Sequence, residues 1–231
     1  MTTKVSLQEL LDSGAHFGHQ ARRWNPKMSS YLYGVQDGVH VFDLVKTKTA
    51  LEEALEFLKK SVSEGKTILL LGTKKQAKEK TIEVAVEAGV PYVSERWLGG
   101  TFSNFEQVKK SVKKLADMKV SLSAGEYNKY TKRERLLIER EITRLERFFG
   151  GISTLTKLPD VLFVVDTHKE IGAVQEAVNA KITVVGIVDS NADPDLVDYP
   201  IPMNDDAVKA LSYVLDMVKN AILDGKKKIK K

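Results

Sequence analysis

Apolar residues along the chain follow two different spacings, which predict strands alternating with helices. Short apolar runs bounded by turn residues predict strands, and apolar residues three or four positions apart predict amphipathic helices. The predicted strands cover residues 39–43, 67–71, 91–93, 160–166, 183–189 and 199–201, and the predicted helices cover 6–12, 48–62, 76–88, 170–180 and 205–223. Alternating strands and helices form mostly parallel sheets covered on both faces, so the predicted fold class is α/β.

The first 34 residues combine a helix start with a stretch that lacks clear periodicity. Ser6 and Glu9 have the spacing of a capping box, in which the hydroxyl and the carboxylate each satisfy a free amide of the first turn, and Gly14 marks the helix end. Residues 15–34 mix basic and aromatic side chains and predict an irregular loop.

Between residues 101 and 150 two long charged helical patterns replace the alternation. Apolar residues recur at steps of three and four on both sides of a polar turn at 123–126: Phe105, Val108, Val112 and Leu115 before it, and Ile138, Ile142, Leu145 and Phe149 after it. This spacing predicts an antiparallel coiled-coil hairpin with helices of about 20 residues that extend roughly 30 Å. The predicted organisation is one α/β domain (1–102 with 150–225), the inserted hairpin (103–149) and a disordered basic tail (226–231).

Composition restricts the class of protein. A chain of 231 residues with 42% hydrophobic residues can bury a sizeable core, and the absence of cysteine excludes disulfides and thiolate chemistry. No apolar stretch approaches the roughly 18 residues of a membrane span, and the N-terminus lacks the apolar core of a signal peptide. We therefore expect a soluble, cytoplasmic protein with no membrane partner.

Charge is divided unevenly along the chain. The formal net charge of +5 arises from +2 over residues 1–102, +5 over 103–149, −7 over 150–225 and +5 over 226–231. A polyanion such as RNA is attracted to the three basic segments and repelled by the acidic one. We therefore expect RNA to meet the N-terminal loops, the hairpin and the tail, while the acidic segment faces solvent, a metal ion or a protein.

The segment 16–27 joins cationic side chains to flat aromatic ones. Its candidate RNA contacts are His16, Phe17, His19, Arg22, Arg23, Trp24, Asn25 and Lys27. Arginine and lysine engage phosphates while an aromatic ring stacks on a base, but the same residues also suit a surface loop anchored by its aromatics. Two histidines three positions apart, without a carboxylate or cysteine at matching spacing, give only weak support for a metal site.

Two further segments place cations beside turns. Residues 72–76 lie between a predicted strand and helix, so Lys74, Lys75 and the helix amides are a candidate anion site. The glycine spacing of a Walker A loop is missing, and a solvated basic turn explains these lysines slightly better. Residues 96–104 surround paired glycines that let the main chain approach RNA or a neighbouring helix closely. The candidate RNA contacts in this segment are Arg96, Trp97, Thr101 and Asn104. The hairpin adds a basic face of Lys109, Lys110 and Lys113, although such charge is also typical of a solvated helix.

Four aspartates support an enzymatic alternative. Asp166 and Asp189 end predicted strands, and Asp205 and Asp206 open a predicted helix. Carboxylates clustered at the carboxyl ends of parallel strands could hold Mg²⁺ for phosphoryl transfer or nucleotide chemistry. Helix capping explains the last two more simply, and no phosphate-binding glycine signature or nucleophile paired with a base accompanies them. A structural divalent cation, Mg²⁺ or Zn²⁺, would be held by Asp189, Asp205 and Asp206. A third alternative, a coiled-coil adaptor without nucleic acid, leaves the basic aromatic loops unexplained.

Seven segments resemble the family of the second protein of the small ribosomal subunit, in its bacterial form. They run in order from about residue 7 to residue 223: GAHFGHQ (14–20), RRWNPK (22–27), GTKKQA (72–77), RWLGGT (96–101) with Asn104 and Phe105, LPD (158–160), DSNADP (189–194) and NDD (204–206). Each segment alone is weak, whereas seven in register are highly specific. Thr183 and Met203 depart from the family's usual proline and glycine.

The resemblance implies a flavodoxin-like three-layer domain with an inserted coiled coil, docked on ribosomal RNA as a structural part of translation and not as an enzyme. It implies RNA contact at the loop 16–27, at Lys74 and Lys75, at Arg96 and Trp97, and on the hairpin. It also implies neighbouring small-subunit proteins as partners, the first protein of that subunit among them. No cofactor and no small-molecule substrate are expected.

Overall fold

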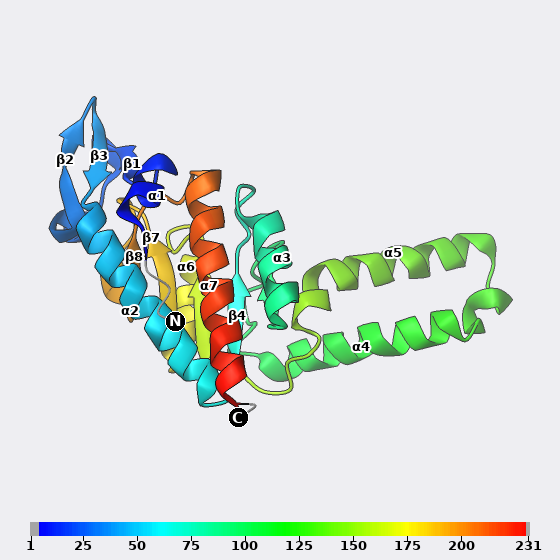
Figure 1. The fold of residues 1–231 in the computed structure, drawn as a ribbon. Coiled ribbons are helices and arrows are strands. Elements are labelled where there is room, and N and C mark those ends of the chain that lie inside the picture. The colour runs from blue at the N-terminus through cyan, green and yellow to red at the C-terminus, as the bar shows by residue number, and fades with distance from the viewer. Residues whose placement is uncertain (1–4, 230–231) are drawn as a thin grey trace.

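The computed structural model describes residues 5–229 and has a five-stranded parallel sheet at its centre (Figure 1). Its strands are β4 (Ile68–Leu71), β5 (Tyr92–Val93), β6 (Val161–Val164), β7 (Thr183–Val188) and β8 (Tyr199–Pro202), in the spatial order β5-β4-β6-β7-β8. The first of these strands in the sequence lies inside the sheet, with the second on one side and the third on the other. This is the strand order of flavodoxin-like folds, and the predicted α/β fold class is confirmed.

The central strands are continuous apolar runs because helices cover both of their faces. Every residue of β4 and β6 is buried, and successive residues belong to different cores. Leu70 and Phe163 lie in one core cluster, while Leu69 and Leu162 lie in the other. The alternation of a strand's side chains therefore builds the two cores from the same short segments.

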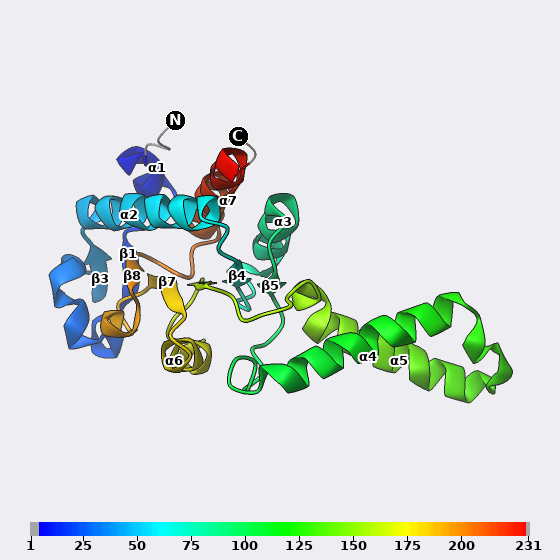
Figure 2. The same cartoon turned by 90° about the horizontal axis from the view of Figure 1, so that it is seen from below.

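Helices form the outer layers, as Figure 2 shows. On one face of the sheet lie α2 (Leu44–Ser63), α3 (Lys78–Ala88) and α7 (Val208–Ile229), and on the other lies α6 (Ile171–Asn179). The helix α2 begins four residues earlier than predicted because the Asp43 carboxylate accepts the Val45 amide and caps it. Within residues 5–229 no helix is both long and apolar enough to cross a bilayer.

The C-terminal tail corrects one expectation. Residues 226–229 were expected in a disordered tail but continue α7, and residues 230–231 lie outside the described part of the chain. Lys226 Nζ donates to the carbonyls of Ala88 and Gly89 at 2.8 and 2.9 Å, at the end of α3. The first lysine of the basic run therefore caps a neighbouring helix, where its charge complements the helix dipole.

A second, antiparallel sheet occupies the segment that was predicted as an irregular loop. It consists of β1 (Phe17–Gln20), β2 (Leu32–Gln36) and β3 (Val39–Phe42), in the order β1-β3-β2, with the short 3₁₀ turns Ala21–Arg23 and Pro26–Tyr31 between β1 and β2. The predicted strand 39–43 belongs here and not to the parallel sheet. Periodicity missed β1 and β2 because most of their residues are at least partly exposed, so their sequences carry no apolar alternation.

The first helix, α1 (Leu7–Asp12), follows the prediction with one change at its start. The Ser6 hydroxyl accepts the Glu9 amide, and Gly14 follows with a φ of 79°. The amide of Ser6, however, donates to Tyr213 Oη at 3.1 Å. The second half of the expected capping box is thus replaced by a contact with α7, which ties the N-terminal helix to that layer.

Two further helices, α4 (Phe105–Ser123) and α5 (Lys132–Phe149), lie side by side and extend away from the sheet (Figures 1 and 2). A small core of Leu115, Ile142 and Leu145 joins them, and a complete capping box of Thr131 and Glu134 starts α5. At their base, Val108, Val112 and Phe149 pack against the core on the α6 face of the sheet. Whether these helices form a separate folding unit stays a prediction.

Candidate nucleic-acid interface

Two exposed cations of the segment 16–27, Arg22 and Arg23, lie on the first 3₁₀ turn, between β1 and β2. Arg22 and Arg23 are exposed, and Arg22 Nε donates to Gln20 Oε1 at 3.1 Å. The Ala21 amide donates to the Gly38 carbonyl at 2.9 Å and so fixes the turn against the β2–β3 connection. Both guanidinium groups are therefore held on an ordered turn and remain open to a partner.

The aromatic residues of the same segment are partly exposed. The Phe17 residue is 49% exposed and its ring lies 4.0 Å from the ring of His16. The Trp24 residue is 38% exposed and its ring packs on the buried His40 at 4.9 Å. These rings therefore anchor the loop and keep part of their surface exposed, and their contact with RNA stays a prediction.

Asn25 and Lys27 are engaged within the protein. The Asn25 amide donates to the Ser190 carbonyl at 2.7 Å, and its side chain accepts the Lys27 amide at 3.1 Å. Lys27 Nζ lies 2.8 Å from carboxylate oxygens of both Asp193 and Asp195. The charge of Lys27 is thus balanced by the loop that follows β7, and this residue joins the N-terminal segment to the main sheet.

His19 belongs to an acidic cluster and not to the exposed surface of its segment. Its Nδ1 lies 3.0 Å from Asp189 Oδ1, its Nε2 lies 3.8 Å from Asp206 Oδ2, and its amide donates to Ser190 Oγ. The hydrogen bond with Asp189 raises the pKa of His19 above its ordinary value, because it favours the protonated ring. This internal pairing competes with an RNA contact, and RNA binding by His19 stays a prediction.

Lys74 is the second cation of this cluster. Its Nζ lies 2.5 Å from Asp205 Oδ1, 2.6 Å from Asp206 Oδ1 and 3.3 Å from Asp166 Oδ2. Burial opposes its charge, but the neighbouring Asp205 outweighs that penalty and raises the pKa of Lys74. Only Lys75, the next residue, points a free exposed side chain outward. The predicted pair at this turn thus divides into one internal and one external residue.

The pKa values of two carboxylates in the cluster shift in opposite directions. Burial, with the charges of Asp189 and Asp166, raises the pKa of Asp205 to about 8. Burial also opposes the charge of Asp189, but the hydrogen bond from His19 lowers the pKa of Asp189 in balance. Asp205 therefore holds its proton to higher pH than Asp189 does.

The expected metal ligands are arranged differently from the prediction. His19, Asp205 and Asp206 each offer one ligand atom, and these atoms lie within 4.8 Å of one another. Asp189 instead accepts the amides of Ser190 and Asp205 at 2.5 and 3.1 Å. Ligand atoms around tetrahedral zinc stand roughly 3.4 Å apart, so an ion would require these side chains to close in and the Lys74 ammonium to withdraw.

The loop 96–104 closes around a carboxylate of the protein itself. Glu176, on α6, accepts the amides of Gly100 and Phe102 at 2.7 and 2.9 Å, and lies 3.4 Å from Trp97 Nε1 and 3.5 Å from the Ser103 amide. The main chain at the paired glycines therefore does approach a neighbouring helix, and its approach to RNA stays a prediction. No sequence pattern pointed to Glu176, because it lies on a separate helix more than 70 residues away along the chain.

Only part of this loop can reach a partner. Trp97 packs edge-on against Phe102 in the core, and Thr101 is buried with its hydroxyl donating to the Leu98 carbonyl. Their side chains are buried in the described structure, so their predicted RNA contacts are less favoured than those of exposed residues and stay predictions. Arg96 and Asn104, in contrast, are exposed.

The hairpin lysines divide in the same way. Lys109 Nζ lies 2.8 Å from Glu106 on the same helix, so an ion pair partly occupies it. Lys110 and Lys113 are exposed, and together with Lys114 they line a shallow groove along α4. Two of the three lysines predicted to form a basic hairpin face, Lys110 and Lys113, therefore line one groove.

Comparisons with known proteins agree on one family. The family model described as Ribosomal protein S2 matches residues 10–225. The "Small ribosomal subunit protein uS2" of Roseiflexus sp. (strain RS-1) is 48% identical over 221 residues, which are 96% of this chain and 84% of that protein. The protein of the same description from Nocardia farcinica (strain IFM 10152) is 46% identical over 96% of this chain and 78% of its own length. For Microcystis aeruginosa (strain NIES-843 / IAM M-2473) the identity is 44%, covering 96% and 84%.

Proposed function

The chain belongs to the ribosomal protein S2 family, and from this premise we propose how its surface holds it in place. As a member of that family it is a structural constituent of the small ribosomal subunit, associated with its RNA and proteins, and takes part in translation. The family is not one of enzymes, so the phosphoryl-transfer alternative has no support. What remains to be assigned is which residues bind the RNA.

We assign RNA binding to the predicted cations that have no carboxylate partner. Within residues 5–229, no ion pair within 4 Å engages Arg22, Arg23, Lys75, Arg96, Lys110 or Lys113, whereas His19, Lys27 and Lys74 are paired internally. An unpaired exposed cation can release counterions from a phosphate backbone, while a paired one must first break its own ion pair. This division is the observation that carries the proposal, with Phe17 and Trp24 as partly exposed aromatic neighbours.

The acidic segment 150–225 is proposed to face protein neighbours of the small subunit. Its net charge of −7 opposes close contact with RNA over much of its surface. The first protein of the subunit is the expected neighbour here, as the resemblance of the sequence implies. A structural Mg²⁺ or Zn²⁺ stays a prediction for the acidic cluster, where an imidazole among the donors suits zinc better than magnesium.

The loop is tested by reversing both free arginines. We expect Arg22→Glu with Arg23→Glu to remove the chain from small subunits on a sucrose gradient, because both phosphate contacts become repulsive. Lys27 is left unchanged, since its reversal would also break the pairs with Asp193 and Asp195. The matched control reverses two exposed lysines elsewhere, Lys60→Glu with Lys209→Glu, for the same change in net charge.

Circular dichroism of each purified variant checks that it is folded. If the folded arginine variant sediments with small subunits as the wild-type chain does, the loop is not the RNA contact. If both double variants leave the subunits equally, net charge and not the position of the arginines controls assembly.

A further inference from the structure

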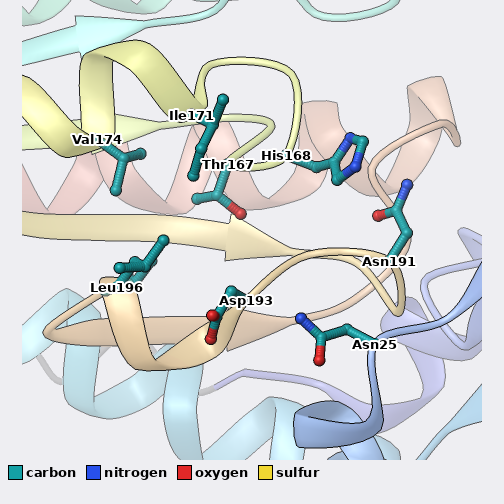
Figure 3. A pocket seen from close by; sticks show the side chains of 9 residues that line it. Asn25, Thr167, His168, Ile171, Val174, Asn191, Asp193 and Leu196 are labelled. Carbon is teal, nitrogen blue, oxygen red and sulfur yellow. The ribbon is translucent and has the colours of Figure 1, made fainter.

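A cavity of about 310 Å³ opens where β6 and β7 end, outside the acidic cluster. Its lining comes from three places in the sequence, namely the N-terminal segment, the start of α6 and the loop after β7: Asn25, Thr167, His168, Ile171, Val174, Asn191, Asp193, Leu196 and Val197. Figure 3 shows that Val174 and Leu196 lie at one end of the cavity, and that His168, Asn191 and Asn25 lie at the other. The cavity thus has an apolar end and a polar end.

We propose that this cavity receives one unstacked nucleobase of the ribosomal RNA. This proposal rests on the proposed RNA binding and adds a specific recognition site to it. RNA-binding proteins commonly accept single bases that are splayed out of the strand, with an apolar surface against the ring and hydrogen bonds to its edge. A volume of about 310 Å³ lies at the lower limit of small-ligand pockets and suits one base better than a longer group.

The polar end of the cavity has hydrogen-bonding capacity that the protein does not use. Asn191 Oδ1 is buried and accepts no hydrogen bond from the described residues. Asn25 Oδ1 accepts the Lys27 amide, which leaves the Asn25 amino group as a donor on the cavity side. His168 adds a ring nitrogen from the opposite wall (Figure 3). A base edge carries the alternating donors and acceptors that these groups need, and buried polar atoms rarely stay unpaired.

Charge around the cavity separates the base from its phosphate. Asp193 lines the cavity but is paired with Lys27, and no lysine or arginine of the described residues lines the cavity, so its interior suits a neutral group better than an anion. Arg22 and Arg23 precede Asn25 by only two to three residues along the chain, and Lys169 follows His168. A nucleotide would therefore place its neutral base inside the cavity and its phosphates outside, toward these cations. Two of them, Arg22 and Arg23, are residues to which RNA binding is assigned.

The test blocks the mouth of the cavity without touching the arginines. Ile171, at the start of α6, lines the cavity and is 39% exposed, so Ile171→Trp adds bulk at the opening. Val178, two turns along the same helix, is 47% exposed and lies outside the cavity lining, so Val178→Trp is the matched control. Small subunits carrying each variant are treated with dimethyl sulfate, which reports adenine and cytosine, and with a carbodiimide, which reports guanine and uracil.

We expect one base that is protected in wild-type subunits to become several-fold more reactive in Ile171→Trp and to stay protected in Val178→Trp. His168→Ala, which removes a polar wall without adding bulk, should expose the same base and keeps the test decisive if the tryptophan variant does not fold. Unchanged base reactivity in subunits that contain either cavity variant would overturn the proposal, while leaving RNA binding by the arginines intact. Absence of the wild-type chain from small subunits would instead overturn the proposed function.

Discussion

Removal of the Glu176 carboxylate should destabilise the protein strongly, although this side chain touches none of the proposed RNA contacts. The carboxylate accepts two short hydrogen bonds from the amides of Gly100 and Phe102 and two longer ones from Trp97 and Ser103. A hydrogen bond to a charged group contributes about 1.5–3 kcal/mol, and removal of the carboxylate leaves the amides of Gly100 and Phe102 without the acceptor they have in the described structure. Counting the two short bonds alone, we expect Glu176→Ala to lower the free energy of unfolding by about 3–6 kcal/mol.

Urea unfolding at neutral pH, followed by circular dichroism, measures this loss. Glu176→Gln should fall between the wild type and Glu176→Ala, because the amide keeps one acceptor oxygen and turns its amino group toward backbone donors. Glu106→Ala is the control, since its side chain is 79% exposed and pairs only with Lys109 on the same helix. A loss below about 1 kcal/mol for Glu176→Ala, similar to the control, would refute the idea that this carboxylate organises the loop.

Two further predictions concern the acidic cluster and the hairpin. The folded-state pKa of Asp205 is raised to about 8, and that of His19 is also raised, so folding takes up protons. The stability that these two groups contribute is complete at low pH and is lost as pH rises through their folded-state pKa values. The free energy of unfolding should therefore fall between about pH 5 and pH 9, and Asp205→Asn should flatten that fall. A rise in the free energy of unfolding over the same window would contradict this prediction. In the hairpin, Leu145→Ala should lower the free energy of unfolding by about 2–4 kcal/mol and speed proteolysis within α4 and α5. Leu136→Ala, at a site 47% exposed, should change little. Equal cleavage of both variants would show that the small core does not hold the helices together.

The parallel sheet was predictable because its strands are buried on both faces. Short apolar runs such as 68–71 and 161–164 leave few alternatives, and the helices between them carry clear periodicity. The antiparallel sheet was not predictable in the same way, since β1 pairs with β3 across about 20 residues and neither β1 nor β2 hides an apolar face. Pairing over such a distance leaves no local pattern in the sequence.

The candidate site was predictable in residue type but not in direction. Lys74 and Lys75 are adjacent residues of the same type after the end of β4. Only the folded structure shows that Lys74 meets Asp205 and Asp206, while Lys75 is exposed. The carboxyl ends of β4, β6 and β7 share one edge, so the aspartates after β6 and β7 could have signalled an internal partner for a lysine after β4. Nothing local could have shown that Trp97 is buried, because it packs in a core cluster built from distant parts of the chain.

The attachment of the hairpin at one end makes it a lever. Its helix α5 has 18 residues and so extends about 27 Å from a base anchored by Val108, Val112 and Phe149. A rotation of about 5° at that base would move the far end by roughly 2 Å over this length. The apolar packing at the base and the ion pair of Arg147 with Glu95, at 2.7 Å, therefore limit how far the distal turn can swing relative to the sheet.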